Sequence, residues 1–239
     1  SSTYLDGTYN SCLDEANAIA YTHGVSSDSF AAVSYSDRAN PAVLGGISGD
    51  STYMNGAYDV ACNLDNSIVY VTGELSNSVA AINVADPSSP SRVGGIIDGT
   101  NLDNPIGIVY EASGDLLFVA CYDGGALTVL SVADDAASPV VLGSVSSTSY
   151  MDAARYVASF PAAGLVFVTG RDSDSVCVVD VSDPFNPTVK EGLVDSTYMN
   201  GAQGIAWDPA AKLLFVAGAN SDSLAVMTLE GIPTAIPTL

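Results

Sequence analysis

The sequence is poor in basic residues. Only six lysines and arginines stand against 27 aspartates and glutamates in 239 residues, which gives a formal net charge of −21. This field repels phosphate backbones and anionic lipid heads, so it argues against nucleic acids and membrane surfaces as partners. Only 14% of the residues are charged and 48% are hydrophobic, which excludes a disordered acidic tail. Cations, neutral glycans and other proteins remain as partners.

Long hydrophobic runs and helical patterns are also missing. No stretch reaches the ~18 to 20 uninterrupted apolar residues of a membrane helix, and the chain does not open on a secretory leader. No window keeps a 3.6-residue periodicity with helix caps. We therefore expect no membrane insertion and almost no helix. The opening Ser1 without Met and the proline-punctuated end at 232–237 leave open a larger parent chain or assembly.

The four cysteines have none of the spacings of a zinc site. They are Cys12, Cys62, Cys121 and Cys177, with no CxxC pair and no Cys/His cluster. Buried thiols are one interpretation. The other is one or two disulfides in an oxidising compartment, and Cys12 with Cys62 is the pair to test.

A motif of the form Thr-Tyr-Met-Asn-Gly occurs five times. The copies begin at spacings of 49, 48, 49 and 48 residues, at Thr3, Thr52, Thr100, Ser149 and Thr197. Four short, β-branched runs follow each copy and are bounded by turn residues. In the second repeat these runs are 58–61, 68–71, 79–84 and 92–97. A fixed period of this length predicts a stacked or closed array of repeats.

Four strands in each repeat of about 48 residues predict an all-β, five-bladed β-propeller. We expect one propeller over residues 1–239, and its blades cover about 3–51, 52–99, 100–148, 149–196 and 197–239. The outer strand of the last blade is expected at 234–239. An open β-solenoid is the alternative, although solenoid repeats are usually shorter and more uniform.

The third run of each repeat leads into an Asp-Pro or Asn-Pro turn in the clearest copies. The segments 79–90 and 176–187, the second of which reads VCVVDVSDPFNP, resemble the LVIVD-repeat propellers, whose repeats read like VVDVSDPxNP. The resemblance spans the whole chain. It implies a propeller of the extracellular space or cell surface without an assigned reaction, and so supports fold and location more than activity.

One end of this propeller is expected to collect Asp and Asn side chains. The strands of a blade alternate in direction, so the loops before the first strand and between the second and third lie at the same end. The motif contributes one such residue per blade, namely Asp6, Asn55, Asp103, Asp152 and Asn200. Because Ca²⁺ prefers about this many oxygen ligands, the set is a candidate metal site. The alternative is that these residues only form turns.

The same loops contain four tyrosines, Tyr4, Tyr53, Tyr150 and Tyr198. Aromatic faces stack on the C–H surfaces of sugars, and neighbouring amide and carboxylate oxygens bond sugar hydroxyls. The tyrosines and the five Asp and Asn residues are therefore candidate ligand-binding residues. The alternative is that each tyrosine packs between neighbouring blades.

Catalysis has weaker support. His23, the single histidine, lies near Asp28 and several serines, but no Gly-x-Ser-x-Gly nucleophile elbow is present. Asp103, Asp152 and Asp172 could supply paired carboxylates for glycoside cleavage. The regular repetition argues against an enzyme, because active sites usually break such symmetry, and we assign no catalytic residue.

The fourth repeat differs in its charge. Arg155 and Arg171 place two of the six basic residues near the expected loop end. These two cations either hold an anionic ligand or neutralise Asp152 and Asp172.

The sequence as a whole favours a non-catalytic, extracellular or cell-surface module that binds glycans, with Ca²⁺ as a candidate cofactor. A structural subunit that docks other proteins is the alternative. A glycan-cleaving hydrolase or lyase is the third hypothesis.

Overall fold

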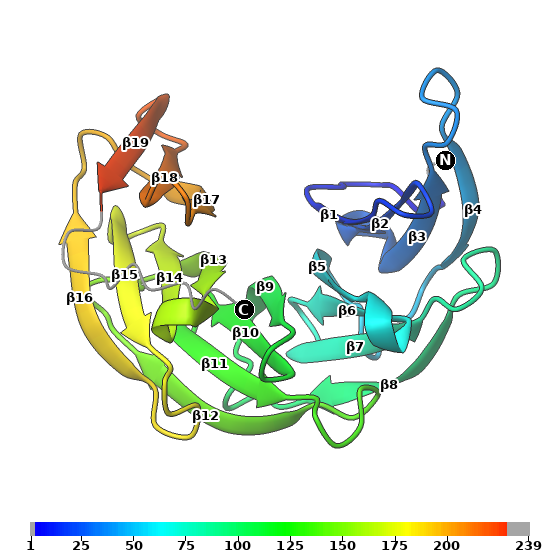
Figure 1. Ribbon diagram of the computed structural model, residues 1–239, viewed down its shortest axis with the longest axis horizontal. Coiled ribbons are helices and arrows are strands. Elements are labelled where there is room, and N and C mark those ends of the chain that lie inside the picture. The colour runs from blue at the N-terminus through cyan, green and yellow to red at the C-terminus, as the bar shows by residue number, and fades with distance from the viewer. Residues whose placement is uncertain (1–2, 229–239) are drawn as a thin grey trace. The chain divides into compact units, whose positions relative to one another are not determined.

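The computed structural model describes residues 3–228, which form 19 strands in five antiparallel sheets (Figure 1). Four sheets have four strands in chain order and the fifth has three. The five sheets follow the five sequence repeats, which confirms the all-β fold and, for the first four repeats, the expected four strands. The strand expected at 234–239 lies outside the described residues.

The first two sheets have the following bounds. The first contains β1 (Ser11–Asp14), β2 (Ile19–Gly24), β3 (Ser29–Ser34) and β4 (Ala42–Ile47). The second contains β5 (Ala57–Asn63), β6 (Ile68–Gly73), β7 (Ser78–Asn83) and β8 (Ser91–Ile97).

The other three sheets repeat this plan. The third contains β9 (Pro105–Glu111), β10 (Leu116–Cys121), β11 (Ala126–Ser131) and β12 (Val140–Ser146). The fourth contains β13 (Ala154–Phe160), β14 (Leu165–Gly170), β15 (Ser175–Asp180) and β16 (Thr188–Val194). The fifth contains β17 (Ala202–Asp208), β18 (Leu213–Gly218) and β19 (Ser223–Thr228). Within residues 3–228 the helical segments are three short 3-10 turns, Val25–Ser27, Leu64–Asn66 and Pro161–Ala163.

The chain divides into two compact units. One comprises Ser1–Leu117 with Leu130–Val140, and the other comprises Phe118–Val129 with Val141–Leu239. In the described residues no helix is both long and apolar enough to cross a membrane.

The core of each unit lies between successive sheets. Second and third strands are rich in valine, leucine and aromatic residues, which suit a pleated surface buried on both faces. In the first unit a core cluster joins Tyr21 and Phe30 of the first sheet to Met54, Val69 and Val71 of the second repeat. The repeat therefore gains its stability from its neighbour, as the sequence period implies.

The turn between the second and third strands ends in a left-handed residue in all five repeats. The φ angle there lies between 46° and 52°, at Asp28, Asn77, Gly125, Asp174 and Asp222. Asp, Asn and Gly tolerate this conformation better than other residues. The turn chemistry is thus kept along the chain although most surrounding residues change.

A disulfide joins Cys12 in β1 to Cys62 in β5, the pair that the sequence singled out. The other two cysteines, Cys121 and Cys177, are buried thiols. Both interpretations of the cysteines therefore hold, each for one pair.

Candidate functional site

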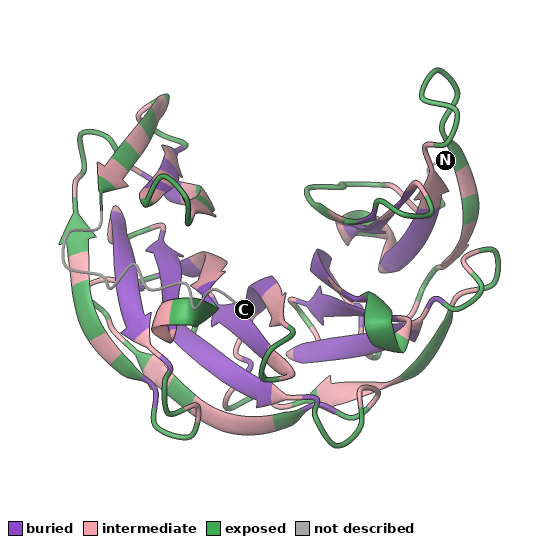
Figure 2. Ribbon diagram, in the orientation of Figure 1, coloured by how far each residue is buried: buried purple, intermediate pink, exposed green. Residues whose placement is uncertain are grey.

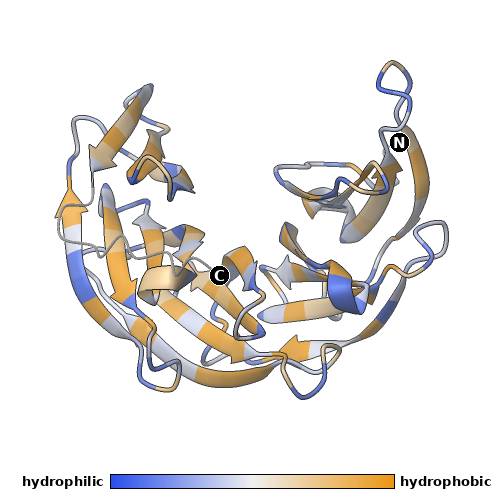
Figure 3. Cartoon of the chain, viewed as in Figure 1, coloured by the Kyte–Doolittle hydropathy of each residue, from blue (hydrophilic) through white to orange (hydrophobic). Residues whose placement is uncertain are grey.

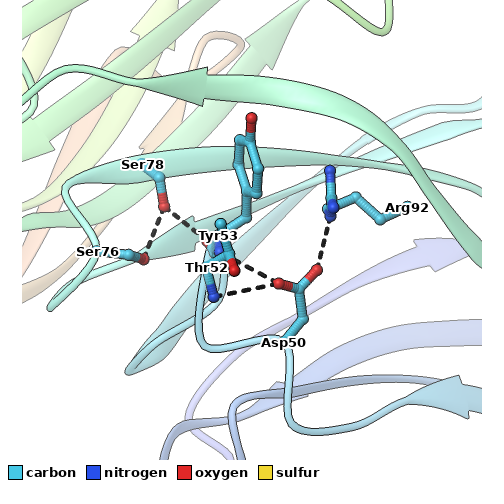
Figure 4. Close-up of polar contacts among 6 residues, drawn as sticks. All are labelled: Asp50, Thr52, Tyr53, Ser76, Ser78 and Arg92. Carbon is cyan, nitrogen blue, oxygen red and sulfur yellow. Dashed lines mark hydrogen bonds and ion pairs between the residues drawn. The ribbon is translucent and has the colours of Figure 1, made fainter.

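The motif tyrosine of the second repeat, Tyr53, is held tightly by nearby residues. Asp50 Oδ1, at the end of the first repeat, accepts the backbone N–H groups of Thr52 and Tyr53 at 3.2 and 3.3 Å, and Arg92 Nε lies 2.6 Å from Asp50 Oδ2 (Figure 4). The Arg92 guanidinium carbon lies 4.3 Å from the centroid of the Tyr53 ring. Ser78 Oγ donates to the Tyr53 carbonyl at 2.6 Å. These contacts fix both the backbone and the ring.

The serine contact recurs in four repeats. Hydroxyls of Ser29, Ser78, Ser175 and Ser223 donate to the carbonyls of the four motif tyrosines. Tyr4, Tyr53 and Tyr150 are half-buried, and their rings pack against glycines of the fourth strand, Gly46, Gly95 and Gly192. Tyr198 is 57% exposed. Three of the four tyrosines thus have a packing role within their own blade, and much of each ring is inaccessible to a ligand.

Four of the five Asp and Asn residues of the motif make the same backbone hydrogen bond. Carbonyls of Asp6, Asn55, Asp152 and Asn200 accept N–H groups from the turn between the second and third strands of the same repeat. The side chains of Asp6 and Asp152 are exposed, and those of Asn55, Asp103 and Asn200 are half-buried. Within residues 3–228 no group of three or more His, Cys, Asp or Glu side chains could hold a metal ion. The Ca²⁺ site stays a prediction.

A second set of hydrogen bonds links successive repeats. Asp28 Oδ1 accepts the Gly56 N–H at 2.9 Å, and Asp174 Oδ1 accepts the Gly201 N–H at 2.8 Å. Asn77 makes the same bond to the Asn104 N–H at 3.0 Å. Three polar side chains of the turns between the second and third strands therefore hold neighbouring loops together.

The first unit also contains a buried polar cluster that the sequence did not predict, centred on Asp59 of β5. This side chain is 2% exposed. Its Oδ1 accepts from the Asn10 amide at 2.7 Å and the Val60 N–H at 2.8 Å, and its Oδ2 accepts from the Ile108 N–H at 3.0 Å. Burial raises the pKa of Asp59 to about 7, and these three donors oppose the rise. The carboxyl is thus buried, and its two oxygens accept three hydrogen bonds.

His23, at the end of β2, is fully buried beside this cluster and hydrogen-bonded. Its Nε2 accepts the backbone N–H of Asn10 at 3.3 Å, so the neutral ring carries its proton on Nδ1. Burial lowers the pKa of His23 to about 4, and a contact with the Ala57 carbonyl opposes the shift. Asn10 therefore bridges the two groups, with its backbone on His23 and its amide on Asp59.

Comparison with the other repeats explains the buried position of His23. The first strand of a blade has an irregular register at this point, as between Ala57 and Val60. Thr72 Oγ1 accepts the buried Asp59 N–H at 2.9 Å, and Thr169 Oγ1 accepts the Tyr156 N–H at 3.0 Å. His23 occupies the threonine position in the first repeat. An alignment of the repeats, in which histidine replaces threonine at this position, could have revealed the role of His23 from the sequence.

A stack of aromatic rings lies next to the cluster. Tyr9 and Tyr58 are 5.2 Å apart between centroids with an interplanar angle of 16°, and Tyr58 lies 6.5 Å from the His23 ring at 16°. Tyr58 is 7% exposed and Tyr9 is 65% exposed. Thr8 Oγ1 donates to the His23 carbonyl at 2.9 Å, which anchors the backbone just before Tyr9. We call Tyr9, Asn10 and Tyr58 the Tyr9 platform.

The two arginines of the fourth repeat gather around Tyr122. Arg171 Nη1 lies 3.2 Å from the Tyr122 hydroxyl and 3.1 Å from Asp172 Oδ1. The Arg155 guanidinium carbon lies 5.9 Å from the Tyr122 ring centroid. The Arg171 contact favours the neutralising role, because its charge is shared with an aspartate of the same turn.

Comparison with known proteins shows the fold. No protein-family model and no curated protein sequence matches the chain, so the LVIVD likeness rests on the repeat residues alone. A Pseudomonas aeruginosa periplasmic gluconolactonase is similar in structure, with 14% identity and a TM-score of 0.79 over 95% of this chain and 68% of its own. A functionally unknown Desulfotomaculum acetoxidans protein has 18% identity and a TM-score of 0.72 over 94% and 69%.

A third similar structure, Kuenenia stuttgartiensis hydrazine synthase, has 20% identity and a TM-score of 0.70 over 89% of this chain and 55% of its own. The chain therefore spans about two thirds or less of the length of these structures. These structures are β-propeller-like, so the likeness supports propeller-type blades, and the identities are too low to transfer an activity.

Proposed function

We propose that the protein binds neutral carbohydrate at the Tyr9 platform. The observation that carries the proposal is an exposed tyrosine ring stacked flat on a buried one. The outer face of Tyr9 can stack on the C–H surface of a sugar, because Tyr58 beneath it holds the ring in a fixed orientation. The underlying contacts hold the ring in place before binding, which lowers the ordering cost.

Polar residues of the same segment fit the same ligand. Asp6 and Asn10 are exposed on the segment that leads into β1. Carboxylate and amide groups accept from and donate to sugar hydroxyls. The net charge of −21 repels anionic ligands, so neutral sugars are favoured over phosphorylated or acidic ones.

Tyr9 is a better candidate for stacking on a sugar than the motif tyrosines. Tyr4, Tyr53 and Tyr150 give much of their ring surface to their own blade, whereas Tyr9 gives its outer face to solvent. Tyr9 lies just outside the five motif copies. Repetition of the motif therefore marks the scaffold, whereas the Tyr9 position varies between repeats, with tyrosine again at Tyr58 and other residues at Ile106, Arg155 and Gln203.

An extracytoplasmic location is part of the proposal. The Cys12–Cys62 disulfide supports it, because such bonds persist in oxidising compartments. One of the similar structures, the Pseudomonas aeruginosa gluconolactonase, is itself a periplasmic protein, which agrees with this location.

A panel of immobilised neutral oligosaccharides tests carbohydrate binding. Wild-type protein should bind at least one class of sugar, and Tyr9→Ala should weaken that binding about tenfold, which corresponds to about 1.4 kcal/mol. Tyr198→Ala is the matched control, because Tyr198 is similarly exposed but belongs to another repeat. Equal loss in both variants, or no binding by the wild type, would refute the proposal.

Hydrolysis of a sugar lactone is a second candidate. One similar structure is a gluconolactonase, and Asp59 has a pKa of about 7, which suits a general acid or base. Against it, all three donors around Asp59 are already bonded to it and the side chain is 2% exposed. A pH-stat assay with gluconolactone decides the matter: turnover that Asp59→Asn abolishes and Asp103→Asn keeps would favour the enzyme over the binding module.

A further inference from the structure

The fourth and fifth sheets show how one blade covers the next. The outer face of the fourth sheet contains Leu165, Phe167, Val176 and Val178, which are 3%, 0%, 3% and 5% exposed. They belong to one core cluster with Met199, Ala202, Leu214 and Val216 of the fifth repeat. This interface therefore pairs four large apolar residues of the fourth sheet with a loop methionine, an alanine and two aliphatic residues of the fifth repeat.

The fifth sheet has the same large apolar face, and no other described sheet of the second unit covers it. Leu213 and Phe215 are half-buried, and Leu224 and Val226 are 59% and 52% exposed. These four residues hold the repeat positions of Leu165, Phe167, Val176 and Val178. Phe215 and Val226 are register partners, so the residues lie on one face of the sheet.

The contrast is visible along the strands. Figure 2 shows β14 and β15 mostly buried, whereas β18 and β19 alternate between more and less exposed residues. Figure 3 shows hydrophobic residues along β18 and β19 as well. An exposed apolar face of this kind marks an interaction site.

We propose that this face, formed by Leu213, Phe215, Leu224 and Val226, docks a further four-stranded repeat of the same type. The interface between the fourth and fifth sheets supports this occupant, because the fifth sheet presents residues of the same kind in the same register as the fourth. The partner repeat is recognisable by its chemistry. Its motif loop carries Met or Leu, as at the fully buried Met54, Leu102, Met151 and Met199.

The lengths of similar structures fit this occupant. About two thirds of the gluconolactonase and of the Desulfotomaculum protein match a chain of five repeats. The remaining third of each therefore has room for two more repeats of this size. A repeat of the same type is thus a partner of realistic size for this face.

A second copy of this chain is a poorer occupant. Its first repeat would present Leu5, Ala20 and Thr22 where the fifth presents Met199, Leu214 and Val216. The Thr22 hydroxyl already donates to the Asn10 carbonyl at 2.7 Å, so this surface is smaller and more polar. Burying it would bring less apolar area out of water.

Thiol labelling tests the face directly. The native cysteines are bonded or buried, so Val226→Cys introduces one reactive thiol, and Val178→Cys is the matched control at the covered position of the fourth sheet. We expect a water-soluble maleimide to label Val226→Cys at least 100-fold faster than Val178→Cys. Leu224→Cys provides a second reporter if Val226→Cys fails to fold.

The docking step is tested by a fusion. A copy of residues 149–196 appended after Leu239 should slow labelling of Val226→Cys at least tenfold, and the same copy carrying Met151→Asp should not. Slow labelling of the unfused protein would overturn the proposal, because the face would already be covered. Protection that depends on protein concentration would also overturn it in favour of self-association, and so would an appended repeat that adds β-sheet signal by circular dichroism without protecting the thiol.

Discussion

The neutral His23 and the near-neutral pKa of Asp59 predict opposite effects of pH on the stability of the first unit. The two changes that isolate them are His23→Thr and Asp59→Asn. Threonine occupies the His23 position in the second and fourth repeats, where its hydroxyl accepts the same backbone N–H, so this substitution keeps the local fold. Asparagine keeps the shape of Asp59 and removes its titration.

The sign differs for the two groups. The pKa of His23 falls from 6.5 to about 4 on folding, so its contribution to the free energy of unfolding is complete above pH 6.5 and is lost as the pH falls towards 4. The pKa of Asp59 rises from 3.8 to about 7, so its contribution is complete below pH 3.8 and is lost as the pH rises through 7. With about 1.4 kcal/mol per pKa unit, the two contributions are about 3 and about 4 kcal/mol.

Urea unfolding followed by circular dichroism between pH 4 and 8, with the disulfide intact, measures these contributions. Relative to the wild type, the free energy of unfolding of Asp59→Asn should rise by up to about 4 kcal/mol as the pH increases from 4 to 8. That of His23→Thr should fall by up to about 3 kcal/mol between pH 4 and 6.5. Using differences from the wild type removes the contribution of other carboxylates and of hydrogen bonds that do not titrate.

The outcome that refutes this reasoning is a pair of differences that stay constant within about 0.5 kcal/mol across the whole range. Such a result would mean that neither His23 nor Asp59 is buried in the folded protein. Two differences of the same sign would also contradict the account, because burial must favour the neutral form of an acid and of a base in opposite pH directions.

Three further predictions concern the scaffold. Replacing Cys12 and Cys62 by serine opens a loop with a sequence separation of 50 and should lower the free energy of unfolding by about 4 kcal/mol, measured by urea unfolding against the oxidised wild type. Gly95→Ala should cost more than about 2 kcal/mol, because φ is +138° and the new Cβ would lie 2.5 Å from the Val79 carbonyl oxygen, whereas Gly49→Ala, with φ at +71° and open space around it, should cost about 1 kcal/mol in the same assay. If the five motif Asp and Asn residues bind Ca²⁺, millimolar Ca²⁺ should raise the melting temperature by several degrees over EDTA, and an unchanged melt would leave them as turn residues.

The sequence revealed the scaffold because its information is local and repeated. The spacing of the motif, the turn residues and the β-branched runs each occur in every repeat, so together they predict five four-stranded units, four of which the described residues show in full. The strand at 91–97, expected at 92–97, shows how closely the boundaries follow. The Tyr and Asx loops were also placed correctly at the end that contains the turns between second and third strands.

The site could not be predicted in the same way. Asp59, His23 and Asn10 meet only because the first strand has an irregular register, which leaves backbone N–H groups for side chains to satisfy. Nothing in the spacing of the repeats reports that irregularity. The packing of Tyr53 on Gly95 likewise depends on the path of the fourth strand, so its ring looked more accessible in the sequence than it is.

Isothermal titration of the oligosaccharide that binds best, into wild type, Tyr9→Ala and Tyr198→Ala, tests the central claim most directly. The account predicts one dominant site, an affinity about tenfold weaker in Tyr9→Ala, and an affinity unchanged within about twofold in Tyr198→Ala. Equal affinities in all three proteins would contradict it, because the stacked ring of Tyr9 would then contribute nothing to recognition.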